Sequence, residues 1–171
     1  SNPDVEPGAT VEVQVAPFLI GVAEVLQPEW QAVRGAPRVP GYGETYPQTN
    51  VHFDHVNNWL ELAGDGLRLP SEAEFEYAAR AGTTTPFWWG SDPDLAGTYS
   101  VYWLHALSAR RITSMNQLYV PLPVRPRGRT PNAFGLVDTL GNAWEWCADD
   151  PHPLAKTPRD GIAYRTENGS R

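Results

Sequence analysis

The chain contains a single cysteine, Cys147, among its 171 residues. One cysteine excludes an internal disulfide bond, and it also excludes a metal site built from two thiolates of the same chain. Lysine is equally rare, with one Lys against twelve Arg. This bias fits a GC-rich genome and carries no information about mechanism.

Positive charge and long apolar runs are also scarce. Thirteen Lys and Arg residues stand against twenty Asp and Glu residues, so the formal net charge is -7. An acidic chain argues against nucleic-acid binding, because the phosphate backbone attracts basic surfaces. No apolar run is long enough to cross a bilayer, so we expect no membrane span. The partner we expect is a protein or a small-molecule ligand.

Residues that make turns and large aromatic side chains are abundant. Seventeen Pro and fifteen Gly predict a fold rich in loops and argue against a helical bundle. Seven Trp and seven Tyr supply large packing units, and exposed ones can serve a binding surface. The length of the chain fits one domain with a sizeable core.

The run GLVDTLGNAWEW, residues 135–146, combines a turn with oxygen-bearing side chains. On a strand, Trp144 and Trp146 would share one face and Glu145 would point the other way. Asp138, the turn at 141–142 and Glu145 offer the oxygen ligands that calcium prefers. The alternative is a tight turn leading into a core strand, with Asp138 capping the turn and Glu145 solvated or paired with an Arg.

The run LRLPSEAEFEYAARAG, residues 67–82, predicts a helix over 71–81. Ser71 is a favourable N-cap, and Glu74 three residues later completes a capping box. Gly82 supplies the stop at the C-terminal end. One apolar stripe at helical spacing is formed by Phe75, Ala78 and Ala79.

Further elements are predicted by local patterns. Alternation of Val with polar residues over 10–15 favours a half-buried strand. Pro28 suits the first turn of a helix from Gln27 to about Val33. A stripe of apolar residues predicts a helix over Phe53–Ala63, capped by Asn50 or Asp54. Residues 83–129 are expected to be irregular, with a short strand near 118–120.

Together, the two signature runs resemble the formylglycine-generating enzyme (sulfatase-modifying factor) family. The resemblance extends over about residues 11 to 150. It implies an α+β fold of the irregular, loop-rich type related to C-type lectins, with two main helices and short antiparallel strands. We therefore expect residues 1–171 to form a single domain of this type, incomplete at both its N-terminal and C-terminal ends.

The resemblance also implies one calcium site. Carried over to this chain, its four ligand positions are Asp138, Gly141, Ala143 and Glu145. The family's second calcium site uses an Asp, and the matching stretches around 96–98 and 114–117 contain none, so we expect one calcium ion. No catalytic residue and no residue that binds an organic cofactor is expected in this chain.

In the family's oxidases, two Cys in a C-terminal segment bind copper after an Arg-Gly-Gly-Ser stretch. Cys147 follows the WEW motif and is not at one of those positions. Copper is therefore expected only if a segment beyond Arg171 carries the Cys pair. The reading that follows is a non-catalytic domain that binds a ligand or protein, of the kind found in variable proteins diversified by retroelements. The alternative is a formylglycine-generating oxidase, or a related enzyme that forms C–S bonds, whose catalytic segment lies outside this chain.

The histidines and the central aromatic residues carry weaker signals. His52 and His55 are three residues apart and suggest a metal pair on a helix face, although a structural role is the commoner outcome. His105 and His152 stand alone in the sequence and are expected at the surface or in the core. Of the aromatic residues between 87 and 103, most are expected in the core, and one or two could line a ligand surface.

Overall fold

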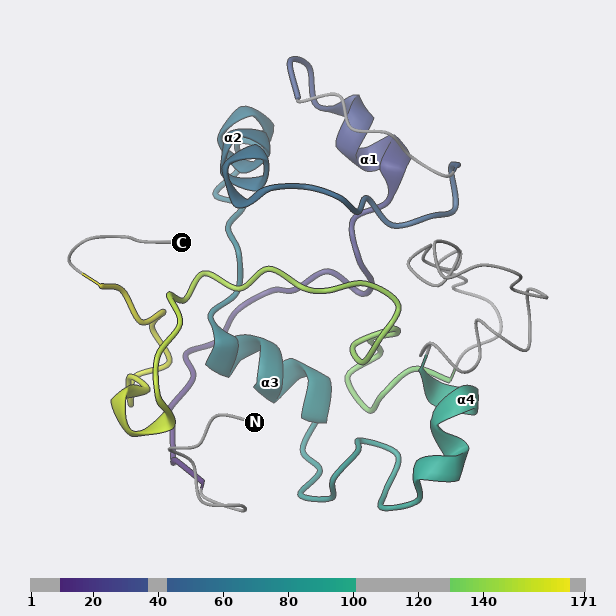
Figure 1. The fold of residues 1–171 in the computed structure, drawn as a ribbon, viewed down its shortest axis with the longest axis vertical. Coiled ribbons are helices and arrows are strands. Elements are labelled where there is room, and N and C mark those ends of the chain that lie inside the picture. Colours follow the sequence, from purple (N-terminus) through teal and green to yellow (C-terminus); the bar gives the residue numbers. More distant parts are fainter. Residues whose placement is uncertain (1–9, 37–42, 101–129, 167–171) are drawn as a thin grey trace. The chain divides into compact units, whose positions relative to one another are not determined.

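A computed structural model describes residues 10–36, 43–100 and 130–166 of the chain (Figure 1). Four α-helices lie in these ranges, joined by long irregular segments. They are α1 Gln27–Ala32, α2 Phe53–Ala63, α3 Glu72–Arg80 and α4 Ala96–Tyr99, with single 3-10 turns at Pro93–Leu95 and Leu154–Lys156. No helix of the described residues is long and apolar enough to cross a membrane.

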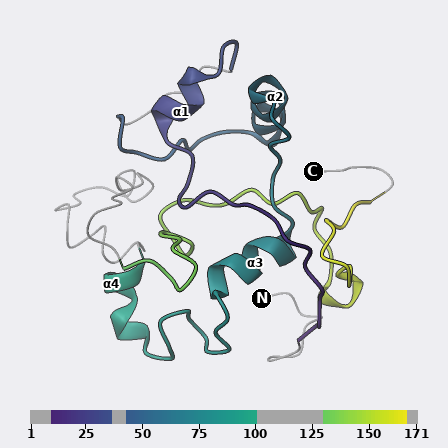
Figure 2. The same ribbon diagram turned by 180° about the vertical axis from the view of Figure 1, so that it is seen from behind.

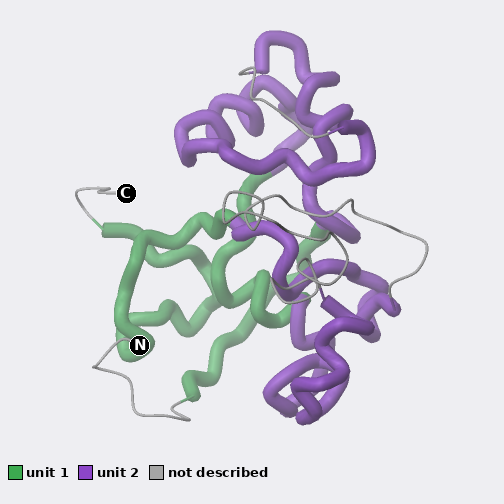
Figure 3. Tube along the Cα trace, turned by 45° about the vertical axis from the view of Figure 1, so that its right-hand side comes forward, with its two compact units in different colours: residues 1–20, 68–78, 146–171 green, residues 21–67, 79–145 purple. Residues whose placement is uncertain are grey.

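The chain divides into two compact units, each assembled from segments far apart in the sequence (Figure 3). The first unit combines residues 1–20, 68–78 and 146–171. The second combines residues 21–67 and 79–145. The division passes through α3, and the predicted calcium loop belongs to the second unit.

In the second unit, α1 packs against α2 through two tryptophans, and the two helices are neighbours when viewed from the front and from behind (Figures 1 and 2). The indole rings of Trp30 and Trp59 stack with their centroids 5.4 Å apart. Trp59 also donates its Nε1–H to the carbonyl of Trp30 at 3.0 Å. Both residues are buried, so the indole N–H that burial would otherwise leave without water has a partner.

Helix α3 begins as its sequence predicts. The Glu74 amide donates to the Ser71 hydroxyl at 3.1 Å, and the Ser71 amide donates to the Glu74 carboxylate at 2.8 Å. Arg68 donates two hydrogen bonds of 2.7 Å to the same carboxylate. The bonds from Arg68 hold the pKa of Glu74 below its usual value. At the other end, the helix stops after Arg80, where Ala81 and Gly82 both take left-handed conformations with φ of +48° and +86°.

Side-chain and backbone bonds tie the segments of the first unit together. The Ser71 hydroxyl that caps α3 also donates to the carbonyl of Gly161 at 2.7 Å. The amide of Ala148 donates to the carbonyl of Pro70 at 2.8 Å. Asp150 is buried, and one of its oxygens accepts from both the amide and the hydroxyl of Thr166. The start of α3 is thereby joined to the C-terminal part of the chain.

The expected strands are not confirmed in the described ranges. Residues 11–15 alternate between half-buried and exposed side chains as predicted, but the amide of Gln14 donates to the carbonyl of Arg159 and not to an adjacent strand. A ladder needs a partner that offers bonds at alternate residues. Isolated bridges join Leu26 to Pro47 and Phe87 to Gly90. The strand expected near 118–120 lies outside the described residues.

Two local expectations about helices were wrong. Helix α2 has the predicted bounds, but its N-cap is His52, whose side chain makes no capping bond. Asn50 lies two residues earlier, in a left-handed conformation with φ of +58°, and Asp54 is already inside the helix. Helix α4 interrupts the segment that was predicted to be irregular. It was missed because a run of four residues is too short to show a helical periodicity in the sequence.

Candidate functional site

The segment before loop 138–145 is fixed by one buried asparagine. Asn132 donates through Nδ2 to the carbonyl of Ala79, near the end of α3. Its side-chain oxygen accepts from the amides of Phe134 and Leu136 at 3.0 and 3.1 Å. One residue further along, the amide of Val137 donates to the carbonyl of Val22 at 2.9 Å. This last bond places the start of the loop beside the chain that carries Glu24.

The loop itself, residues 138–145, turns through three left-handed residues. Asp138, Gly141 and Asn142 have φ of +57°, +88° and +60°. Glycine takes this conformation without steric cost, and Asp and Asn tolerate it better than other residues. The amide of Ala143 donates to the carbonyl of Gly141 at 2.8 Å, so the chain reverses tightly here. Asp138 is buried, although it is a carboxylate.

A second carboxylate, Glu24, joins this loop from more than a hundred residues away. Asn142 donates through Nδ2 to Glu24 Oε1 at 2.9 Å. Glu145 is exposed as a whole residue, yet its carboxyl end is crowded enough by protein atoms that burial raises its pKa to about 7, and the charge of Glu24 adds to the rise. The direction follows from two effects that both disfavour the ionised form.

These features bear on the two alternatives for Glu145. The charged group that acts on Glu145 is Glu24, which has the same sign, so the reading of Glu145 paired with an Arg finds no support in the described residues. A carboxyl group whose pKa is raised by burial and by the charge of a second carboxylate is in an environment that a divalent cation relieves.

The donor atoms of the loop fit calcium better than a softer metal. Carboxylates and backbone carbonyls are oxygen ligands, and calcium takes six to eight of them. The carbonyl of Gly141 already accepts one hydrogen bond, which leaves its second lone pair for a cation. Glu24 is an additional carboxylate that sequence reasoning missed. Its only signal was a position in an early segment of the family resemblance, because nothing in its local pattern points to residue 142.

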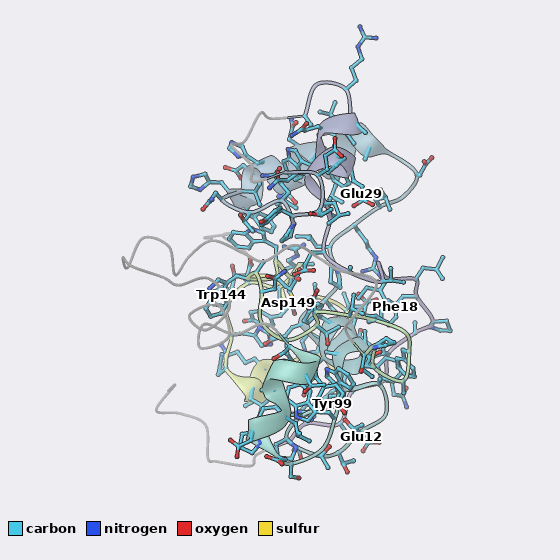
Figure 4. The ribbon with its side chains drawn as sticks, turned by 90° about the vertical axis from the view of Figure 1, so that its right-hand side faces the viewer. Glu12, Phe18, Glu29, Tyr99, Trp144 and Asp149 are labelled. Atoms are coloured by element: carbon cyan, nitrogen blue, oxygen red, sulfur yellow. The ribbon has the colours of Figure 1, made fainter. Side chains whose placement is uncertain are left out.

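The two tryptophans of the WEW motif do not lie in a core strand. Trp144 is fully exposed (Figure 4), and Trp146 is also exposed. Leu140, on the same loop as Trp144, is exposed as well. The loop therefore presents apolar side chains beside its oxygen-rich turn.

The other aromatic residues form a separate cluster in the second unit. The ring of Tyr99 stacks on Trp89 at 5.4 Å and meets Trp88 edge-on at 5.0 Å. The ring of Phe87 also stacks on Trp89, with centroids 4.7 Å apart. All four rings are half-buried, so they are neither a closed core nor a free surface. Tyr102 and Trp103 lie outside the described residues.

The histidines divide into two situations. The rings of His52 and His55 meet edge-on at 5.6 Å, but no third ligating side chain joins them in the part of the chain that the structure describes. His152 was expected to stand alone from its position in the sequence, but in the structure it lies beside Glu72 and Asp149. Glu72 lies 77 positions before Asp149, to which its amide donates a hydrogen bond, so no local pattern could reveal the set of three. His105 lies outside the described residues.

Comparison with known proteins places the chain in a family. Residues 4–169 match the family model described as "Sulfatase-modifying factor enzyme 1-like domain". The formylglycine-generating enzyme of Mycobacterium tuberculosis is 39% identical over 110 residues, which cover 63% of this chain and 35% of that protein. The chain spans between about a third and a half of the length of the curated relatives it matches.

Two solved structures are similar to this one. PvdO from Pseudomonas aeruginosa superposes with a TM-score of 0.59 at 31% identity, over 75% of this chain and 48% of that chain. Treponema denticola variable protein 1 also gives a TM-score of 0.59, at 22% identity, over 85% of this chain and 67% of that chain. The second similarity concerns the fold alone. With the match over residues 4–169, these results show that the chain belongs to the formylglycine-generating enzyme, or sulfatase-modifying factor, family.

Proposed function

We propose that this chain is a calcium-stabilised scaffold of the formylglycine-generating enzyme type, and that it binds a protein or small-molecule ligand without catalysing a reaction itself. The observation that carries the proposal is the combination found on loop 138–145. An oxygen-rich turn, joined by the carboxylate of Glu24, lies beside the fully exposed indole of Trp144.

The calcium ion would be held by the carboxylates of Asp138 and Glu145 and by the carbonyls of Gly141 and Ala143. The charge of the ion would offset the repulsion between Glu24 and Glu145. The pKa of Glu145 is raised to about 7. The ion would thereby fix the loop that carries Trp144. An exposed tryptophan on an ordered loop offers a large apolar face at low entropic cost, which is favourable for ligand binding.

The calcium part of the proposal is tested by thermal unfolding of this chain. A cation that binds the native state alone stabilises it by mass action, by about 2.7 kcal/mol at a hundredfold excess over its dissociation constant. We expect the midpoint temperature to rise with calcium and to fall with chelator in the unchanged chain. Glu145→Gln should lose this response to calcium. Glu12 is exposed and belongs to the other unit, so Glu12→Gln should keep the response. Equal responses in all three proteins would refute the calcium site.

The binding part is tested on the same loop with Trp144→Ala. If the loop presents a ligand surface, this variant should keep the thermal response to calcium and lose binding to whatever partner the unchanged chain retains. A partner bound equally well by both proteins would remove Trp144 from the proposal. The exposed Trp144 makes few packing contacts, so the variant should fold normally.

The second candidate function is that of an oxidase, favoured by the 39% identity to a formylglycine-generating enzyme. That activity needs two thiolates for copper in the family, and this chain has Cys147 alone. We therefore expect this chain with added copper to leave a cysteine-containing sulfatase peptide unoxidised. Turnover above the copper-only control would favour the oxidase, as would a Cys pair in a segment following Arg171 of a longer protein.

A further inference from the structure

Three side chains that can bind a metal meet in the first unit, and none of them belongs to loop 138–145. They are Glu72 at the first position of α3, and Asp149 and His152 from the segment that follows the WEW motif. One potential ligand atom from each lies within 4.8 Å of the others. No other set of three His, Cys, Asp or Glu side chains among the described residues brings its ligand atoms within this distance.

Asp149 is held in place by two backbone amides. Its Oδ2 accepts from the amide of Glu72 at 2.7 Å, and its Oδ1 accepts from the amide of Tyr164 at 2.8 Å. Each oxygen keeps a further lone pair, since a carboxylate offers about four acceptor sites. The carboxylate is therefore oriented before any cation arrives (Asp149 is labelled in Figure 4).

The surroundings of His152 prepare one ring nitrogen to be a ligand. Nδ1 lies 2.9 Å from the carbonyl of Asp150. Because a carbonyl only accepts hydrogen bonds, Nδ1 carries the proton in this contact, and Nε2 of the neutral ring has the free lone pair. Histidines that bind metals characteristically donate their other N–H to a carbonyl or carboxylate. The nearest partner of Nε2 is the hydroxyl of Thr157, at the long distance of 3.3 Å.

The remaining contacts keep the ring and the third ligand available. The ring of His152 stacks on Tyr164 with centroids 4.5 Å apart, which fixes its plane. Glu72 is exposed, and Ser71 with Glu74 already caps α3, so the Glu72 carboxylate is not required to cap the helix. A flexible, exposed carboxylate can close the small remaining distance to an ion.

We propose that Glu72, Asp149 and His152 form a binding site for a divalent transition metal ion of the zinc class. Two carboxylates balance the charge of the ion, and an imidazole nitrogen favours zinc over calcium or magnesium. With three protein ligands, water completes the coordination. The site is independent of loop 138–145, so its failure and the failure of the calcium proposal are distinguishable.

The test is titration of the chain with zinc, followed by calorimetry, and with cobalt, followed by visible absorption. Zinc should bind with one-to-one stoichiometry, and cobalt should produce absorption bands that zinc abolishes. His152→Gln, which removes the nitrogen ligand, should weaken zinc binding at least about tenfold, because changes to groups that only support a ligand already cost ten- to a hundredfold. The melting temperature of the metal-free variant reports whether it is folded.

Two matched variants keep the result interpretable. His52→Gln alters the other histidine pair, and Glu145→Gln alters the calcium loop, so both should bind zinc as the unchanged chain does. If Asp149→Asn weakens binding together with His152→Gln, the site is supported. No binding of zinc to the unchanged folded chain would overturn the proposal. Binding that survives in His152→Gln and disappears in His52→Gln or Glu145→Gln would overturn it too.

Discussion

The glycine at position 161 shows how a single residue decides whether two segments can meet. Its φ is +73°, and a Cβ there would lie 2.9 Å from the carbonyl oxygen of Gln14. Gly161→Ala should therefore incur both the strain of a left-handed alanine and a steric clash with backbone. Each contributes about 1–2 kcal/mol to the loss of stability.

The matched control for Gly161 is Gly66, whose φ is +70° and around which nothing lies within 4 Å. Gly66→Ala should show the conformational strain without the clash. Urea unfolding of both variants measures the difference. Equal losses of unfolding free energy would mean that the close approach of Gly161 to Gln14 makes no energetic contribution.

Glu145 makes the stability of the metal-free chain depend on pH. Its folded-state pKa, about 7, lies above its ordinary value of 4.5. Between these values the folded state binds more protons than the unfolded state, so stability falls as pH rises from about 4.5 to 7. The test compares unfolding free energies at pH 5 and 7.5 in the presence of chelator. Between these pH values, Glu145→Gln should lose less unfolding free energy than the unchanged chain, because it lacks the titrating carboxyl group. A variant with the same pH profile as the unchanged chain would contradict the raised pKa.

At this scale the sequence predicted the residues of the loop but not their neighbours. The turn at Gly141 and Asn142 was recognisable because these residue types favour left-handed conformations, whereas the left-handed conformation of Asp138 was not predicted. Glu24 was not recognisable either, since its contact with Asn142 spans 118 positions. The exposure of Trp144 was also missed, because alternation indicates two faces of a strand without saying that either is covered.

Helices are the elements that the sequence specified best. Helix α2 has the predicted bounds Phe53–Ala63, and α3 begins beside the predicted capping box. Both helices are specified by apolar residues at helical spacing and by capping residues close in the sequence, and these patterns can be recognised from the sequence alone. The expected strands required partners from elsewhere in the chain, and alternation within residues 10–15 carried no information about such partners.

The cap of α3 predicts a specific loss. Ser71→Ala removes the bond from the Glu74 amide at 3.1 Å and the bond to the Gly161 carbonyl at 2.7 Å. We expect a loss of about 1–2 kcal/mol in unfolding free energy, since an N-cap and a buried acceptor are both affected. Ser91→Ala, an exposed position, is the control. A loss no greater than in the control, measured by thermal unfolding, would argue against the cap.

For the whole molecule, composition predicted a loop-rich fold and two motifs carried the resemblance to the family, which the match over residues 4–169 confirmed. The single domain over 1–171 stays a prediction. The two compact units are each assembled from distant segments, and such interleaving cannot be read from local patterns, since it depends on contacts such as Ser71 with Gly161. The set of Glu72, Asp149 and His152 was invisible for the same reason.

The central claim, a cation held on loop 138–145 of this family scaffold, is tested most directly by terbium luminescence. Terbium is a hard cation that binds at calcium sites and emits when a nearby indole transfers energy to it, and Trp144 lies on this loop. We expect emission on excitation of tryptophan, loss of that emission when calcium is added, and little emission from Glu145→Gln that is folded by circular dichroism. Emission unchanged by Glu145→Gln, or undiminished by excess calcium, would contradict the claim.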